Sequence, residues 1–141
     1  MLAEMKNLAK QKDICVLATV AGQKPYCSLM AYVTDENCEE IYMVTHTNST
    51  KYRNMMQNPA VCLLIDTREK SPRSQAKALT VQGLFCTIET AEKRRKAAVK
   101  LLQTHPHLDS FMRHPEADVF CVKISSFLLL DGLQEAHFES L

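Results

Sequence analysis

The alternation of hydrophobic and polar positions predicts a short N-terminal helix followed by a β-hairpin. Leu2, Met5 and Leu8 recur at helical spacing among charged residues, which is typical of an amphipathic helix. Apolar and β-branched residues then fill positions 14–20, and a second such run covers positions 25–34. The short turn between these two runs indicates an antiparallel hairpin.

Four more strands and two longer helices are predicted farther along the chain. The strands are expected at residues 41–45, 60–67, 78–89 and 118–130, and the helices at residues 52–58 and 91–103. Gly83 interrupts the fifth strand, which predicts a bulge or a bend of a barrel at that point. The tail, residues 131–141, is expected to carry a glycine-containing turn.

The order of these elements predicts the fold class. Six strands with short connections, a helix after the third strand and helices after the fifth indicate a β-rich α+β fold built on an antiparallel six-stranded barrel. The chain has 141 residues, of which 46% are hydrophobic and 23% are charged. This length and composition are typical of one globular domain, here residues 1–141.

Composition and motifs exclude several classes of protein. The formal net charge of +1 argues against a protein held on nucleic acid by phosphate contacts. Gly22, Gly83 and Gly132 stand too far apart for a P-loop or a dinucleotide-binding fingerprint. The sequence shows neither a signal-peptide pattern nor a run of about 18 apolar residues, so we expect a cytoplasmic protein with no membrane segment.

Cysteines and histidines give no pattern of a metal site. The six cysteines are spaced too widely for a zinc knuckle or a redox dithiol motif. Most of them lie inside apolar runs, where a free cysteine behaves as a small buried hydrophobe, so we expect reduced thiols. His105 and His107 lack a third ligand, and we expect these residues, like His46 and His114, to be solvated. No metal is therefore predicted.

The most informative segment is the polar turn after the third predicted strand. Thr45, Ser49 and Thr50 place hydroxyl groups around the start of a helix, where unpaired backbone N–H groups and a positive partial charge attract anions. Lys51 lies in the first turn of that helix, where the helix dipole disfavours a cation unless an anion is near. These residues alone fit either a phosphate site or an ordinary helix cap beside a solvated lysine.

The same segment resembles a known family. Residues 41–51, Ile-Tyr-Met-Val-Thr-His-Thr-Asn-Ser-Thr-Lys, are followed by Asn54 and by Asn-Pro-Ala-Val at residues 58–61. With the hairpin segments at residues 17–20 and 25–30, this pattern is similar to that of the FMN-binding split-barrel proteins related to pyridoxamine 5′-phosphate oxidase. The resemblance covers most of the chain.

The resemblance implies a cofactor, a partner and a set of site residues. It implies a homodimer with FMN at the subunit interface, NAD(P)H as a candidate electron donor, and an oxidoreductase of the pyridoxamine 5′-phosphate oxidase-like family. The residues that would bind the FMN phosphate are Thr45, Ser49, Thr50 and Lys51. The second strand, at Ser28, Leu29, Met30 and Ala31, would lie along the isoalloxazine ring and offer it backbone hydrogen bonds.

The chain also departs from the family pattern. A second basic residue is often found where this chain has Ser28 or Thr50, and its absence is expected either to weaken the binding of FMN or to shift its role to Arg53. The substrate-binding arginine and histidine cluster of the true oxidase has no match near the C-terminus, and no catalytic residue is predicted. Two alternatives stay open. Haem or another ligand could bind without turnover, with His137 as the haem ligand because some relatives use a C-terminal histidine, or the barrel could carry a vestigial site.

Overall fold

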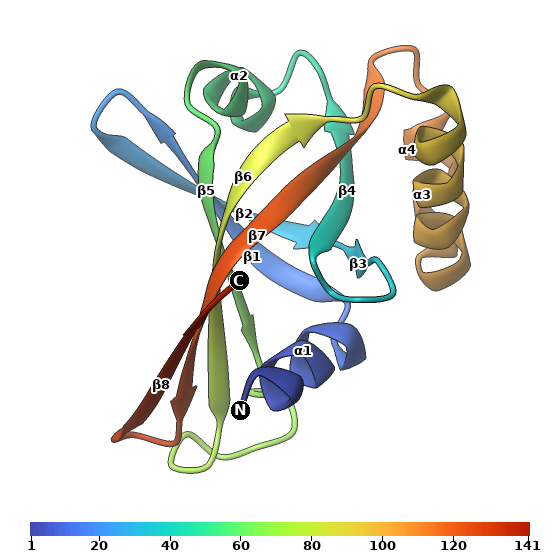
Figure 1. Ribbon diagram of the computed structural model, residues 1–141. Coiled ribbons are helices and arrows are strands. Elements are labelled where there is room, and N and C mark those ends of the chain that lie inside the picture. Colours follow the sequence, from blue (N-terminus) through green and yellow to red (C-terminus); the bar gives the residue numbers. More distant parts are fainter.

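The computed structural model, which describes residues 1–141, contains one eight-stranded antiparallel sheet curled into a half-barrel (Figure 1). The strands are β1 (Ile14–Ala21), β2 (Lys24–Ala31), β3 (Val33–Thr34), β4 (Glu40–His46), β5 (Ala60–Asp66), β6 (Lys77–Thr87), β7 (Ala117–Asp131) and β8 (Glu135–Ser140). Their order in the sheet is β2-β1-β5-β6-β7-β4-β3. The first half of β7 pairs with β4 and its second half pairs with β8, so the sheet divides along β7.

Helices close the two ends of the half-barrel and cover part of its outer face (Figure 1). The helices are α1 (Leu2–Gln11), α2 (Thr50–Gln57), α3 (Ala91–Thr104) and α4 (Asp109–Met112), with a 3-10 turn, η1 (Pro106–Leu108), before α4. α1 closes one end and α2 the other, while α3 and α4 pack beside β4. The Thr90 side chain caps α3 by accepting a hydrogen bond from the Lys93 amide at 3.3 Å.

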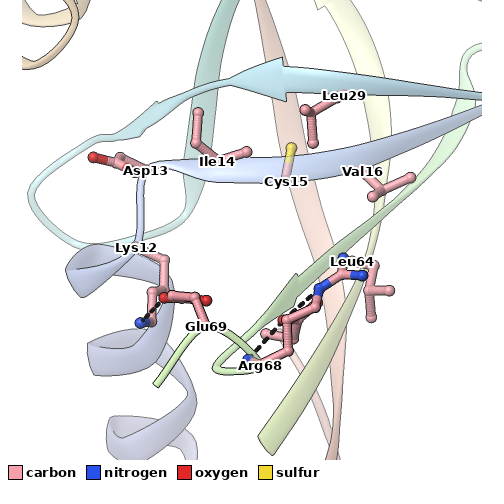
Figure 2. Close-up of a pocket in the computed structure, with 10 residues that line it drawn as sticks. Lys12, Asp13, Ile14, Cys15, Val16, Leu29, Leu64, Arg68 and Glu69 are labelled. Carbon is pink, nitrogen blue, oxygen red and sulfur yellow. Dashed lines mark hydrogen bonds and ion pairs between the residues drawn. The ribbon is translucent and has the colours of Figure 1, made fainter. Parts of the chain in front are cut away.

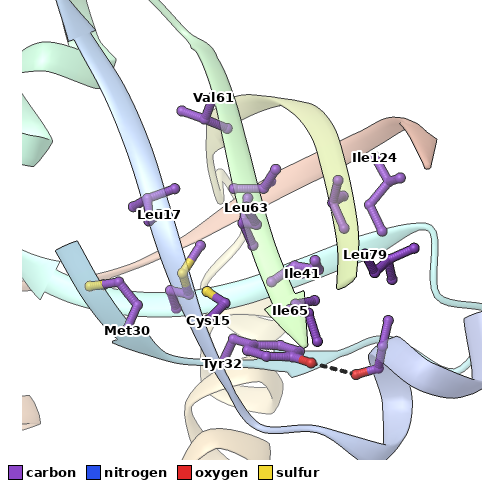
Figure 3. Close-up of a cluster of buried hydrophobic side chains, with 14 of the residues drawn as sticks. Cys15, Leu17, Met30, Tyr32, Ile41, Val61, Leu63, Ile65, Leu79 and Ile124 are labelled. Carbon is purple, nitrogen blue, oxygen red and sulfur yellow. Dashed lines mark hydrogen bonds between the residues drawn. The ribbon is translucent and has the colours of Figure 1, made fainter. Parts of the chain in front are cut away.

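The main core fills the inner face of the sheet. Alternate residues of β1 and β5 point inward, and Leu17, Leu63 and Ile65 are fully buried (Figure 3). Tyr32 reaches into the same core, and its hydroxyl donates a hydrogen bond to the carbonyl oxygen of Ala9 at 2.6 Å. This bond ties the end of α1 to the sheet and satisfies the only polar group of a buried ring.

A second, smaller core lies on the outer face under α3. Ala97 and Leu101 of α3 pack there against Tyr42 and Val44 of β4 and against Cys121 of β7. The outer face is therefore covered at the β4 end of the sheet, whereas the outer face of β1, β2 and β5 carries no helix.

The fifth predicted strand has the expected irregularity at Gly83. The register between β6 and β7 shifts between Gln82 and Gly83. A Cβ atom at Gly83 would lie 2.6 Å from the carbonyl oxygen of Lys123 and 2.6 Å from Cγ1 of Val122. Only glycine lets the two backbones approach so closely at this bend, so the predicted bulge is confirmed.

The predicted order of elements is confirmed, but the count of six strands is wrong. Tyr32 breaks the second predicted strand, so residues 33 and 34 form the separate strand β3. β8 lies in the tail, for which the sequence predicts a glycine-containing turn but no strand. β8 is an edge strand with mostly exposed residues and two glutamates, and its stability comes from pairing with β7 rather than from an apolar pattern of its own.

Candidate functional site

The candidate site forms where β4 ends and α2 begins. Thr45, on the inner face of β4, is buried, and its hydroxyl lies 3.2 Å from the hydroxyl of Ser49. Ser49 is the N-cap of α2, because its Oγ accepts a hydrogen bond from the Tyr52 amide at 3.2 Å. Two hydroxyls therefore meet at the helix start, beside backbone N–H groups that have no partner within the helix.

Two basic side chains belong to the same helix start. Lys51 is half-buried in the first turn of α2, which contains no acidic residue, and its ammonium group forms neither a hydrogen bond nor an ion pair within the chain. The guanidinium of Arg53 bends back and donates to the carbonyl oxygen of Asn48 at 2.7 Å and to Thr50 Oγ1 at 3.4 Å. Arg53 thus lies over the loop that leads into the helix.

Side chains on the opposite side of α2 fix the helix to the sheet. The Tyr52 hydroxyl donates to Asp118 Oδ2 of β7 at 2.9 Å, and Asn54 Nδ2 donates to Thr19 Oγ1 of β1 at 3.1 Å. Burial and the bond to Asp118 raise the pKa of Tyr52 to about 12, so the phenol remains a donor at neutral pH. These two contacts hold the helix start in place relative to β1 and β7.

The predicted ring-binding segment is the free edge of the sheet. Residues 28–31 lie on β2, which pairs only with β1 and so leaves backbone N–H and C=O groups unpaired on its other side. Ser28 lies opposite the buried Leu17 and shares the inner face with Thr45. Leu29 points the other way and is 75% exposed on the outer face.

The structure therefore brings some predicted residues together and separates others. Thr45 and Ser49 are in contact, and Ser28 faces the same side of the sheet. Thr50 is exposed and contacts Arg53 rather than Thr45, and Leu29 can approach a ligand on the inner side only through its backbone.

Sequence reasoning missed the residues that position α2. The apolar pattern of the helix predicted at residues 52–58 gives Tyr52 a packing role only, and the sequence predicts no role for Asp118 or Thr19. A buried polar residue in a strand, such as Thr19 at 2% exposure, gives no signal until its partner on another element is known.

The outer face of the sheet carries an exposed apolar row. Successive register partners across six strands are Leu29, Val16, Leu64, Thr80, Leu128 and Phe138, of which only Thr80 is polar. Leu29, Leu128 and Phe138 are 75%, 42% and 64% exposed. Exposed apolar surface that continues across a sheet is typical of an interface with another macromolecule.

A recess opens at one end of this row (Figure 2). Its apolar wall includes Ile14, Val16 and Leu29, and two ion pairs line its other side. These pairs join Lys12 to Glu69 at 2.6 Å and Arg68 to Asp66 at 3.0 Å. Because each basic group already has an acidic partner, the recess is a weaker anion site than the start of α2.

The histidines do not form a metal site, and one of them differs from expectation. His105 is buried, not solvated, and its Nε2 lies 3.0 Å from the carbonyl oxygen of Tyr32. His46 stacks on Phe111 and on His114. No group of three or more histidine, cysteine, aspartate or glutamate side chains is arranged to hold a metal ion. None of the helices is long and apolar enough to cross a membrane.

An antiparallel half-barrel that divides along one long strand, with a helix capping one end, defines the split β-barrel proteins. A family model described as pyridoxamine 5′-phosphate oxidase matches residues 1–130. The chain therefore belongs to the pyridoxamine 5′-phosphate oxidase family. No curated protein sequence matches the chain.

Solved structures share this fold at low sequence identity. A heme binding protein from Mycobacterium smegmatis superposes with a TM-score of 0.84 at 16% identity, covering 97% of this chain and 56% of that one. A FAD-binding protein from Mesorhizobium loti gives a TM-score of 0.76 at 15% identity, covering 92% and 93% of the two chains. General Stress Protein 26 from Bacillus anthracis gives 0.71 at 20% identity, covering 99% and 98%. These likenesses concern the fold alone.

Proposed function

We propose that the chain is an FMN-binding flavoprotein that acts as an oxidoreductase. The observation that carries this proposal is the start of α2, where Lys51 has no partner in the chain and the hydroxyls of Thr45 and Ser49 meet. Hydroxyl donors, free backbone N–H groups and an unpaired ammonium are the groups that bind a phosphate monoester. Membership of the pyridoxamine 5′-phosphate oxidase family supports FMN as the molecule that carries this phosphate.

The residues at the start of α2 have different roles in binding the phosphate of the cofactor. Ser49 and Thr45 donate hydrogen bonds to the phosphate oxygens, and Lys51 supplies a full positive charge. Arg53 supplies the second positive charge that the family often has at the positions of Ser28 and Thr50, because its guanidinium already lies over the helix start. The bonds of Tyr52 and Asn54 to the sheet keep these donors from moving, which lowers the entropy lost on binding.

The free edge of β2 holds the ring. Backbone groups of Ser28, Leu29, Met30 and Ala31 that do not pair with β1 offer hydrogen bonds to the polar edge of the isoalloxazine. When bound, FMN supplies hydride and electron transfer, with NAD(P)H as the class of donor. The protein orients the ring, and no acid or base residue is needed for a hydride transfer.

The exposed apolar row supports a homodimer. Leu29, Leu128 and Phe138 lie on one face that no helix covers, and a second copy of this chain would bury them. Leu29 belongs both to the row and to the ring-binding edge of β2, so a dimer through this face would place the flavin beside the subunit interface.

The absorption spectrum of the purified protein tests the proposal. The protein is incubated with FMN, desalted and scanned, with an equal amount of riboflavin in a parallel sample. We expect a retained two-band flavin spectrum with FMN and much less retention with riboflavin, because riboflavin lacks the phosphate. A protein that retains neither flavin contradicts the proposal.

Haem is the alternative ligand, because a heme binding protein shares the fold. His137 on β8 is half-buried, and its Nε2 lies 3.9 Å from Glu135 Oε2. β8 pairs with the half of β7 that lies away from Asp118 and α2, so this histidine belongs to a different part of the sheet. A haem Soret band that is lost in the His137→Ala variant would favour this alternative over the flavin.

A further inference from the structure

Two cysteines lie side by side beneath α3, on different strands from the proposed ring-binding edge. Cys86 on β6 and Cys121 on β7 are direct partners in the register of these antiparallel strands. Direct partners have Cα atoms about 4.5 to 5.5 Å apart. A disulfide requires a Cα separation of about 4.4 to 6.8 Å. Strand pairing therefore holds the two residues at bridging distance.

Both thiols point to the same face of the sheet. The residues next to them in sequence, Phe85 and Phe120, belong to the inner core. Because side chains alternate along a strand, Cys86 and Cys121 point to the outer face. Cys86 indeed packs against the cluster that contains Cys121 and residues of α3.

The two thiols differ in their access to solvent. Cys121 is fully buried, whereas Cys86 is half-buried. The register between β5 and β6 ends at Leu84, and a last bond runs from the Phe85 N–H to the Pro59 carbonyl oxygen at 2.8 Å, so Cys86 lies just beyond the part of β6 that pairs with β5. Burial raises the pKa of Cys121, and Cys86 and Glu40 raise this pKa further. A reagent in solution therefore meets Cys86 first, with Cys121 behind it.

We propose that Cys86 and Cys121 are a redox-active dithiol that forms a cross-strand disulfide by exchange with a low-molecular-weight disulfide such as oxidised glutathione. The Cys86 thiolate attacks one sulfur of the reagent, forms a mixed disulfide and releases one glutathione thiolate. The Cys121 thiolate then attacks the Cys86 sulfur, closes the protein disulfide and releases the second glutathione. The protein loses two electrons and two protons, and the reagent gains both to become two thiols. This inference is independent of flavin binding.

A second pair of cysteines shows that accessibility alone does not allow a bridge. Cys27 and Cys62 lie opposite Ala18 from its two sides, so one strand separates them. Two strand spacings place their Cα atoms about 9.5 Å apart, beyond the limit of about 7 Å for a disulfide. Cys27 is exposed and Cys62 is half-buried, so both are accessible, yet geometry prevents a bridge between them.

Thiol counting after exposure to oxidised glutathione tests the proposal. The full chain with Cys27→Ser and Cys62→Ser, which removes the two other thiols that solvent can reach, keeps four of the six cysteines. It is incubated with the reagent, alkylated under denaturing conditions and analysed by mass spectrometry. We expect two thiols to be lost and two to remain, with one cross-linked peptide pair that joins Cys86 to Cys121 and that dithiothreitol reverses.

A second variant tests the order of the two exchange steps. In the chain that carries Cys27→Ser, Cys62→Ser and Cys121→Ser, the second attack is impossible, and we expect one glutathione to stay attached to Cys86. Persistence of all four thiols in the first variant, a bridge between other cysteines, or glutathione attached elsewhere in the second would each overturn the proposal.

Discussion

Asn54 of α2 donates a hydrogen bond from Nδ2 to Oγ1 of Thr19 on β1, at 3.1 Å, and both residues are buried. The bond joins the helix that carries the proposed phosphate site to the strand that lies next to the proposed ring-binding strand β2. The geometry of the site thus depends on a polar contact in the core, where an unmade hydrogen bond is costly.

Removal of one partner of this contact is expected to destabilise the fold. In Asn54→Ala, Thr19 Oγ1 loses its donor in a buried position, and the free energy of unfolding should fall by about 1 to 3 kcal/mol. Urea unfolding monitored by circular dichroism measures this change. The double variant Asn54→Leu with Thr19→Val replaces both partners by apolar groups and should recover part of the loss. A double variant less stable than Asn54→Ala would contradict the explanation.

Gly83 is expected to tolerate no side chain. In Gly83→Ala the new methyl group would lie 2.6 Å from the Lys123 carbonyl oxygen, which is backbone and cannot easily move. Overpacking of this kind costs about 1 to 3 kcal/mol, and thermal unfolding should show a lower Tm. Gly22→Asn is the control, because no atom lies within 4 Å of its Cβ position and asparagine tolerates its φ of +63°. Equal Tm losses in the two variants would contradict this account.

Buried thiols are expected to weaken the fold at high pH. Burial raises the pKa of Cys15 from 9.0 to about 12 and that of Cys38 from 9.0 to about 11. Between pH 9 and these raised pKa values, the unfolded chain has lost thiol protons that the folded chain keeps. The contribution of the protonated thiols to the free energy of unfolding is therefore fully present below pH 9 and is lost as the pH rises from 9 toward 12. Cys15→Ala should show a shallower decline in urea midpoint over this range than the unchanged chain. Equal slopes would argue against the buried thiol as the cause.

The apolar row is expected to control assembly. Leu128→Glu places a charge in the centre of the exposed face and should convert a dimer to a monomer, as measured by light scattering after size exclusion. Val99→Glu on α3 is the matched control, because Val99 is 48% exposed against 42% for Leu128 but lies outside the row. A chain that is monomeric before any substitution, or a Leu128→Glu variant that stays dimeric, would contradict this role.

Much of the fold could be predicted from local sequence, because the effect of several residues on the backbone depends only on their own type and their neighbours in the chain. Examples are the hairpin, Pro59, Thr90 and Gly83. Pro59 ends a helix, Thr90 caps the next one, and Gly83 allows two backbones to approach. β8 could not be predicted in this way, because its hydrogen bonds come from β7 and its own residues are mostly polar.

In the candidate site, too, some residues could be predicted from local sequence and others could not. Thr45, Ser49 and Lys51 lie within seven consecutive residues, so the local sequence alone predicts either an anion site or a helix cap at this point. The contacts of Tyr52 with Asp118 and of Asn54 with Thr19 join residues far apart in the chain and depend on the sheet. The Cys86 and Cys121 pair likewise depends on strand register, and its spacing resembles no dithiol motif.

FMN titration of the Lys51→Ala variant, followed by quenching of flavin fluorescence, tests the central claim most directly. Loss of a charge-assisted bond to the phosphate should weaken binding by about 1.5 to 3 kcal/mol, which is roughly a 10- to 150-fold increase in Kd. Lys70→Ala, an exposed lysine in the loop between β5 and β6, serves as the control. The account predicts weak binding for Lys51→Ala and unchanged binding for Lys70→Ala. An unchanged Kd in Lys51→Ala, in a chain that binds FMN, would show that the phosphate does not bind at the start of α2.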